Sequence, residues 1–124
     1  MSIKSFNLAW IVVKDLKDAV NYYTEVVGLK IRNYDENYGW AELSGEEEEG
    51  AILGISQQND QEDIAPGSNA VVTLTVDNLE NAISDLKKKG AMMLGEIMEV
   101  PGHVKLQGFK DIAGNRLQLV QILS

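Results

Sequence analysis

The sequence predicts an α+β protein made of two similar βαβββ modules in tandem. The first observation is an internal repeat: Val13-x-x-Leu16-x-x-Ala19-Val20 returns 63 positions later (76 − 13) as Val76-x-x-Leu79-x-x-Ala82-Ile83, a shift of about half the 124 residues. The second is that each copy begins at the end of a strand-like apolar run and continues at helical spacing. We expect a single domain with modules at about 1–56 and 69–124, a linker at 57–68, and any ligand site between the modules.

The first module is predicted to contain one strand, one helix and three further strands. Residues 6–13 (FNLAWIVV) form an apolar run of strand length that is rich in β-branched side chains. Asp15 can cap a helix that follows, and Gly28 is placed to end it. The remaining strands of this module are expected at 29–33, 40–43 and 51–55.

The hairpin between the last two of these strands carries four consecutive acidic residues, Glu46 to Glu49, between Gly45 and Gly50. One interpretation is a site for a cation or a basic partner. The other, which we favour, is a solvated hairpin tip that keeps a sheet edge soluble.

The second module repeats the order after a polar segment that contains Pro66-Gly67. Residues 70–76 are expected to form a strand. Asn78 is placed to cap the second helix, which Gly90 closes. The Met92-Met93 pair is interpreted as core filler rather than as pocket lining. Strands are then expected at 92–98, 103–109 and 115–122.

The composition excludes several classes of function. Cysteine is absent, so there is no disulfide, thiolate metal site or cysteine nucleophile. The formal net charge of −8 disfavours binding to nucleic acid or to anionic lipid. The beginning of the chain lacks a signal-peptide pattern, and no apolar run approaches the length that spans a membrane. These features favour a cytoplasmic protein.

Several short motifs occur in an order and at spacings that are fairly specific together. In the first module they are Val13-Lys14-Asp15-Leu16, Tyr22-Tyr23 and Gly28-Leu29; in the second they are Val76-Asp77-Asn78-Leu79 and residues 109–117 (FKDIAGNRL). The chain resembles the glyoxalase/bleomycin resistance protein/extradiol dioxygenase superfamily, also called vicinal oxygen chelate proteins. The resemblance covers nearly the whole chain and implies a curved mixed-sheet half-barrel. Ile112 and Ala113 replace a Pro-Asp step that is usual in the family's last turn.

The resemblance also implies where a metal would bind in enzymes of this superfamily. Counting from the repeat motifs, the four ligand positions hold Leu8, Gly54, Val71 and Gln118. Three of these have no side-chain donor, and the fourth is a neutral amide. A shift by one or two positions supplies only Asn7 or Asn69. We therefore expect no metal site and no cofactor.

A protein of this superfamily without its metal retains a preformed apolar pocket. The expected function is sequestration of a small organic molecule in an apolar groove, as in the bleomycin-resistance branch, where the groove lies at the interface of a homodimer. One alternative is a lyase, isomerase or dioxygenase-type enzyme with atypical metal ligands. Another is a regulatory or interaction module with a collapsed pocket.

Alternation along the strands, in the family's phase, predicts the pocket lining. Trp10 is either a stacking platform for a planar ligand or core filler. Gln118 either orients a ligand or hydrogen-bonds a neighbouring threonine. Glu42 is a base, a holder of a cationic ligand, or an ordinary exposed glutamate. The full set of expected ligand-binding residues is Leu8, Trp10, Val12, Trp40, Glu42, Gly54, Val71, Thr73 and Gln118.

The single histidine, His103, is not expected to be catalytic. In the family's phase Gly108 faces the cavity, so His103 faces away from it. The sequence contains no Ser/His/Asp triad, phosphate-binding loop or redox motif.

Overall fold

The computed structural model describes residues 8–47, 49–60, 64–68 and 71–123. Each predicted module contains one helical region and four strands. The first holds β1 (Leu8–Val13), α1 (Leu16–Asn21), a π-helical continuation (Tyr22–Val27), β2 (Lys30–Asp35), β3 (Trp40–Ser44) and β4 (Ile52–Gln57). The second holds β5 (Val72–Thr75), α2 (Leu79–Lys88), β6 (Met92–Val100), β7 (Val104–Lys110) and β8 (Arg116–Ile122).

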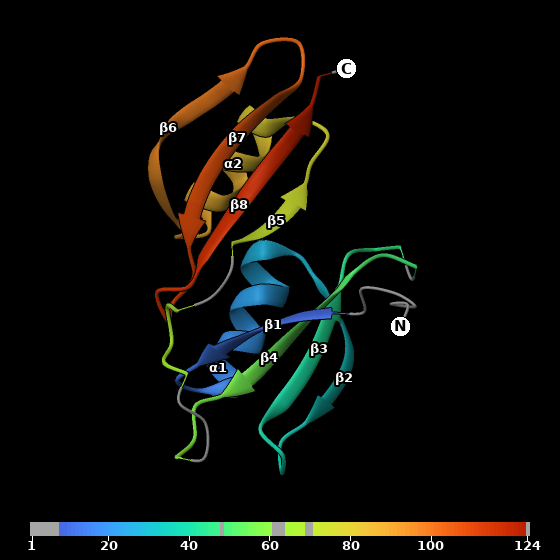
Figure 1. The fold of residues 1–124 in the computed structure, drawn as a ribbon, viewed down its shortest axis with the longest axis vertical. Helices are drawn as coiled ribbons and strands as arrows, with labels where there is room; N and C mark the ends of the chain where they lie inside the picture. Colours follow the sequence, from blue (N-terminus) through green and yellow to red (C-terminus); the bar gives the residue numbers. More distant parts are fainter. Residues whose placement is uncertain (1–7, 48, 61–63, 69–70, 124) are drawn as a thin grey trace, which may run out of the picture.

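The two modules have the same sheet topology. The strand orders are β1-β4-β3-β2 and β5-β8-β7-β6. In each sheet the first and last strands of the module pair in parallel, and the other neighbours are antiparallel. The sheets follow one another along the long axis of the molecule (Figure 1). The predicted α+β class and the two βαβββ units are confirmed.

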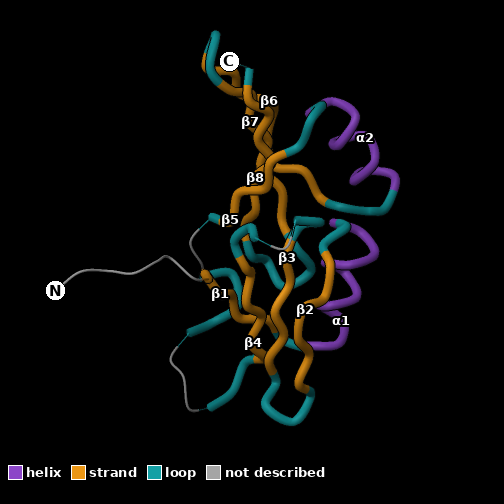
Figure 2. The backbone as a smooth tube through the Cα atoms, turned by 90° about the vertical axis from the view of Figure 1, so that its right-hand side faces the viewer, coloured by secondary structure: helices purple, strands orange, loops and turns teal. Residues whose placement is uncertain are grey.

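Both helices lie on one side of the sheets (Figure 2). Alternate strand residues, such as Ile11, Leu43 and Ile55, point to that side and join a buried core with helix residues such as Leu16 and Tyr23. We call the opposite side of the two sheets the open face. Along each strand, therefore, every second residue packs against the helices, and the residues between them lie on the open face.

The strand ends differ slightly from the prediction. Residues 6, 7 and 70 of the expected strands lie outside the described residues, as does Asn69. β6 runs on to Val100, with an irregular register between Leu94 and Met98. His103 lies in the exposed turn before β7 rather than on the strand. Its backbone N–H donates to the Val100 carbonyl over 2.9 Å, so the residue belongs to the turn.

The first helix begins and ends as predicted but changes width. Asp15 accepts a hydrogen bond from the Asp18 N–H over 2.9 Å, and Gly28 ends the helix with a φ of 93°. From Tyr22 the α-helix widens into a π-helical segment. This segment begins with two consecutive tyrosines, and both of their hydroxyls donate to acceptors in the second module.

Both helices are anchored to the last strand of their module in the same way. The Leu16 N–H donates to Gln57 Oε1 over 3.1 Å, and the Leu79 N–H donates to Gln121 Oε1 over 2.7 Å. Each glutamine accepts from an N–H of the first helical turn, which has no partner within the helix. The repeat therefore extends to these two side-chain anchors, which sequence analysis did not identify.

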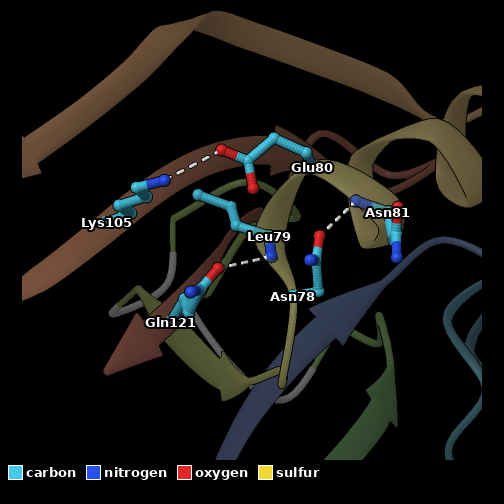
Figure 3. A network of polar contacts seen from close by, with 6 residues as sticks. All are labelled: Asn78, Leu79, Glu80, Asn81, Lys105 and Gln121. Atoms are coloured by element: carbon cyan, nitrogen blue, oxygen red, sulfur yellow. Dashed lines mark hydrogen bonds and ion pairs between the residues drawn. The ribbon is translucent and has the colours of Figure 1, made fainter. Parts of the chain in front are cut away.

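Three polar contacts lie close together at the start of α2 (Figure 3). Besides Gln121, the Asn78 side chain accepts from the Asn81 N–H over 2.9 Å. Glu80 pairs with Lys105 of β7 over 3.0 Å. The cap predicted at Asn78 is confirmed, and α2 is tied to both β7 and β8.

A buried polar junction joins the two modules. The Tyr23 hydroxyl donates to Asp111 Oδ2 over 2.8 Å, and Asn115 Nδ2 donates to the same oxygen over 3.0 Å and to the Val12 carbonyl over 2.9 Å. Asp111 Oδ1 accepts the backbone N–H groups of Ala113 and Asn115, each over 2.8 Å. The turn at 111–115 thus contacts both β1 and the first helical region.

Burial and the neighbouring Asp111 carboxylate raise the pKa of Tyr23 far above its ordinary value. The same two causes, with burial the larger, raise the pKa of Tyr22. Both tyrosines therefore stay protonated in the folded state at neutral pH.

No helix within the described residues is long and apolar enough to cross a membrane.

Candidate functional site

The open face of the first sheet gathers four of the predicted site residues at its centre. β1 and β4 are parallel, which places Trp10 beside Gly54. β3 is antiparallel to β4, which places Glu42 on the other side of Gly54. Trp40 lies two residues before Glu42, so alternation puts both side chains on the same face. We call Trp10, Trp40, Glu42 and Gly54 the tryptophan floor.

Trp40 lies directly over Gly54. A Cβ atom built at position 54 would clash with the Trp40 ring at Cη2 and would lie 2.7 Å from its Cζ2 and 2.9 Å from Cβ of Trp10. Real Cβ atoms essentially never approach other atoms so closely. Only glycine therefore lets the indole lie against β4 in this position. Gly54 stands at a position where the family resemblance implies a metal ligand, and an indole ring covers that position.

Trp10 is not core filler. It is 38% exposed, and its ring contacts Trp40 edge to face, with centroids 6.1 Å apart and an interplanar angle of 63°. Trp40 is only partly buried. The pair presents indole surface on the open face of the sheet.

Glu42 already has a partner within the chain. Its Oε2 accepts a hydrogen bond from Trp40 Nε1 over 3.0 Å, and the side chain is half-buried. Glu42 is therefore not an ordinary exposed glutamate, which was one of the alternatives from the sequence. Sequence reasoning missed the bond, although a donor and an acceptor two positions apart on one strand could have indicated it.

Leu8 and Val12 flank Trp10 on β1. Leu8 pairs with Ile52 and is half-buried. Val12 pairs with Ser56 and is only 4% exposed, yet it lies outside the core cluster beneath the helix. Its carbonyl accepts the junction hydrogen bond from Asn115. The floor is therefore bounded on one side by the contact between modules.

The second sheet carries the other predicted site residues. Thr73 and Gln118 are partners across β5 and β8, and the Thr73 hydroxyl donates to Gln118 Oε1 over 3.2 Å. Gln118 also lies opposite Gly108. Val71, just before β5, is 53% exposed. The bond between Gln118 and a neighbouring threonine, one of the two alternatives from the sequence, is present.

The predicted residues thus form two groups, one on each sheet. Trp10, Trp40, Glu42 and Gly54 are in contact with one another. Thr73 and Gln118 form a separate pair on the second sheet.

The donor chemistry does not fit the metal site that the family resemblance implies. Across the part of the chain that the structure describes, no three His, Asp or Glu side chains are grouped so that they could hold a metal ion. Of the four counted positions, Gly54 lies under Trp40 and Gln118 is bonded to Thr73. Leu8 and Val71 offer only hydrocarbon.

A family model and several solved structures match the chain. The model of the Glyoxalase/Bleomycin resistance protein/Dioxygenase superfamily matches residues 3–119. The chain belongs to this superfamily. The resemblance inferred from the repeat motifs is therefore confirmed.

Two solved structures from Streptomyces sp. CB03234 share the superfamily fold. One is TnmS3, an antibiotic binding protein, with a TM-score of 0.82, 22% identity and 98% coverage of both chains. The other is a glyoxalase/bleomycin resistance protein, with a TM-score of 0.76, 21% identity, and 93% of this chain and 98% of that chain covered.

A superfamily member from Sphaerobacter thermophilus DSM 20745 has a TM-score of 0.76 and 17% identity, with 98% of this chain and 99% of that chain covered. At these identities the likeness establishes the fold alone. No curated protein matches the chain.

Proposed function

We propose that this superfamily member binds a small organic molecule without a metal and holds it against the tryptophan floor. The observation that carries the proposal is the Trp10–Trp40 pair, which presents aromatic surface on the open face directly over Gly54. Aromatic rings stack on indole surfaces and gain from the area that they bury. Sequestration needs only such a surface and a few polar groups, and no reacting centre.

The similarity to an antibiotic binding protein is in keeping with this proposal. The ligand that we expect is planar and aromatic. The chain carries a net charge of −8, so a planar cation is favoured over a planar anion.

The proposal includes a homodimer. Two cross-strand rows on the open face of the second sheet are aliphatic: Met98, Leu106 and Val120 form one, and Val100, Val104 and Ile122 form the other. Met98 is 63% exposed and Ile122 is 60% exposed. A contiguous apolar patch of this kind is characteristic of an interaction surface. The open face of a second copy would cover it and bring Thr73 and Gln118 toward a tryptophan floor.

Tryptophan fluorescence tests the binding proposal, because the only two tryptophans of the chain are both in the floor. Chelator-treated protein is titrated with a panel of planar aromatic compounds that includes proflavine and acridone, which are similar in shape but differ in charge. We expect saturable quenching, stronger with proflavine. The absence of any saturable response across the panel would contradict the proposal. A stoichiometric metal in the purified protein, required for the response, would instead favour an enzyme with atypical ligands.

A further inference from the structure

The orientation of Trp40 is fixed by contacts on three sides. Gly54 leaves room for the ring to lie against β4, Trp10 meets it edge to face, and Glu42 accepts its Nε1–H. These contacts come from three strands: Gly54 from β4, Trp10 from β1, and Glu42 from β3, which also carries Trp40. Glu42 is the only one of the three that provides a directional polar contact.

We infer that Glu42 is a positioning residue, which acts on the ligand through Trp40 by holding the indole flat as a preformed platform. The inference rests on the proposed binding function and names the role of a residue within that site. An indole N–H has one strong hydrogen-bonding direction, and a charged acceptor strengthens that bond. Without the acceptor the ring gains rotamer freedom, which a ligand must remove on binding.

This role differs in a testable way from a direct ion pair with a cationic ligand. Positioning requires an acceptor at Glu42 but not a negative charge. Glu42→Gln keeps an amide oxygen that can accept from Trp40 Nε1, whereas Glu42→Leu keeps the approximate size and removes every acceptor. The two variants therefore separate the need for an acceptor from the need for a charge.

The binding experiment uses one charged and one neutral compound of the panel, proflavine and acridone. We expect Glu42→Gln to keep the dissociation constant within about threefold, because the indole stays in place. Glu42→Leu should weaken binding by about tenfold or more, for charged and neutral compounds alike. If Glu42→Gln weakens proflavine as much as Glu42→Leu does, while acridone is unaffected by either, Glu42 contacts the cation directly and the inference is wrong.

A double-mutant cycle tests whether Glu42 acts through the indole. Trp40→Phe keeps an aromatic ring and removes the N–H donor. In the Trp40→Phe background, Glu42→Leu should cause no further loss of affinity, because the bond it removes is already absent. Additive losses from the two substitutions would overturn the positioning role.

A measurement without ligand separates the failure of this inference from the failure of the binding proposal. The two indole N–H groups give two signals in a proton–nitrogen correlation NMR spectrum. The signal that is missing in Trp40→Phe belongs to Trp40. We expect the Trp40 indole proton to exchange with solvent at least tenfold faster in Glu42→Leu than in the native protein or in Glu42→Gln. Equal exchange in all three proteins would overturn the inference even if a ligand binds.

Discussion

Gly54 shows how one small residue shapes the open face. From the sequence its importance was the absence of a donor at a position where metal-binding relatives carry one. The structure adds that the missing side chain makes room for Trp40. The position could be located from the family resemblance. The neighbour that fills it could not be predicted, because Trp40 approaches from another strand in a rotamer that the sequence does not specify.

Gly54→Ala should therefore destabilise the protein. The added methyl group would clash with the Trp40 ring and with Cβ of Trp10, so the indole has to move. We expect a loss of about 1–3 kcal/mol in the free energy of unfolding, as for other overpacked interiors, together with a changed near-ultraviolet circular dichroism spectrum. Urea unfolding followed by fluorescence measures the loss.

Gly45→Ala is the matched control. A Cβ atom at position 45 meets nothing within 4 Å, and the residue does not have a positive φ. Its effect should stay within about 0.5 kcal/mol. Equal effects of the two substitutions would mean that Trp40 is not held against β4.

At the level of secondary-structure elements, the helix starts and ends were the most predictable features. Asp15, Gly28 and Asn78 were assigned from local capping rules and take those roles in the structure. The Gln57 and Gln121 anchors were not predicted, because each joins residues about 40 positions apart. Such contacts depend on the register of strand against helix, which the local sequence does not fix.

The Asn78 cap gives a direct test of the element that Figure 3 shows. Asn78→Ala removes the acceptor for the Asn81 N–H and should lower the free energy of unfolding by about 1 kcal/mol. Asn78→Asp keeps an oxygen in place and should restore most of that loss. Thermal or urea unfolding of the three proteins provides the comparison. An Asn78→Ala protein as stable as the native one would show that Gln121 and the Glu80–Lys105 pair suffice to start α2.

At the level of the whole molecule, the junction around Asp111 sets how the two modules meet. The motif at 109–117 suggested a turn before the last strand, as the structure confirms, but its Asp and Asn side chains reach across to Tyr23 and Val12 of the other module. The local sequence pattern identifies the turn, whereas the hydrogen-bond partners of its side chains depend on tertiary packing. The Tyr22-Tyr23 pair was one of the motifs that indicated the family, but the sequence did not show that the two hydroxyls bond to the second module.

The junction predicts how stability changes at high pH. Because folding raises the pKa of Tyr23 above its unfolded value of about 10, its contribution is fully present below pH 10 and is lost as the pH rises above it. The free energy of unfolding should fall above pH 10 by up to about 1.4 kcal/mol per pH unit from this residue.

Tyr23→Phe should reduce that slope and, at neutral pH, cost about 1–3 kcal/mol through the lost bond to Asp111. Tyr38→Phe, at a side chain that is 86% exposed, is the control and should leave both quantities unchanged. Urea unfolding between pH 7 and pH 11 measures both. The same slope in the native and Tyr23→Phe proteins would contradict the buried hydrogen bond.

The proposed dimer is tested by two isoleucines of nearly equal exposure. Ile122 is 60% exposed on the open face, and Ile112 is 58% exposed in the turn before β8. Ile122→Glu places a charge in the proposed interface and should shift the protein toward monomer by about tenfold or more in dissociation constant. Ile112→Glu should have little effect. Sedimentation equilibrium measures both, and a native protein that is monomeric at high concentration would exclude the dimer.

The central claim is that the tryptophan floor binds a planar molecule without a metal. The most direct measurement is the proton–nitrogen NMR spectrum of chelator-treated protein during titration with proflavine. The account predicts saturable shifts of both the Trp10 and Trp40 indole signals that added zinc does not change. In Trp10→Leu, the remaining Trp40 signal should no longer shift. Indole signals that stay in place at saturating proflavine, or that move only after metal is added, would contradict it.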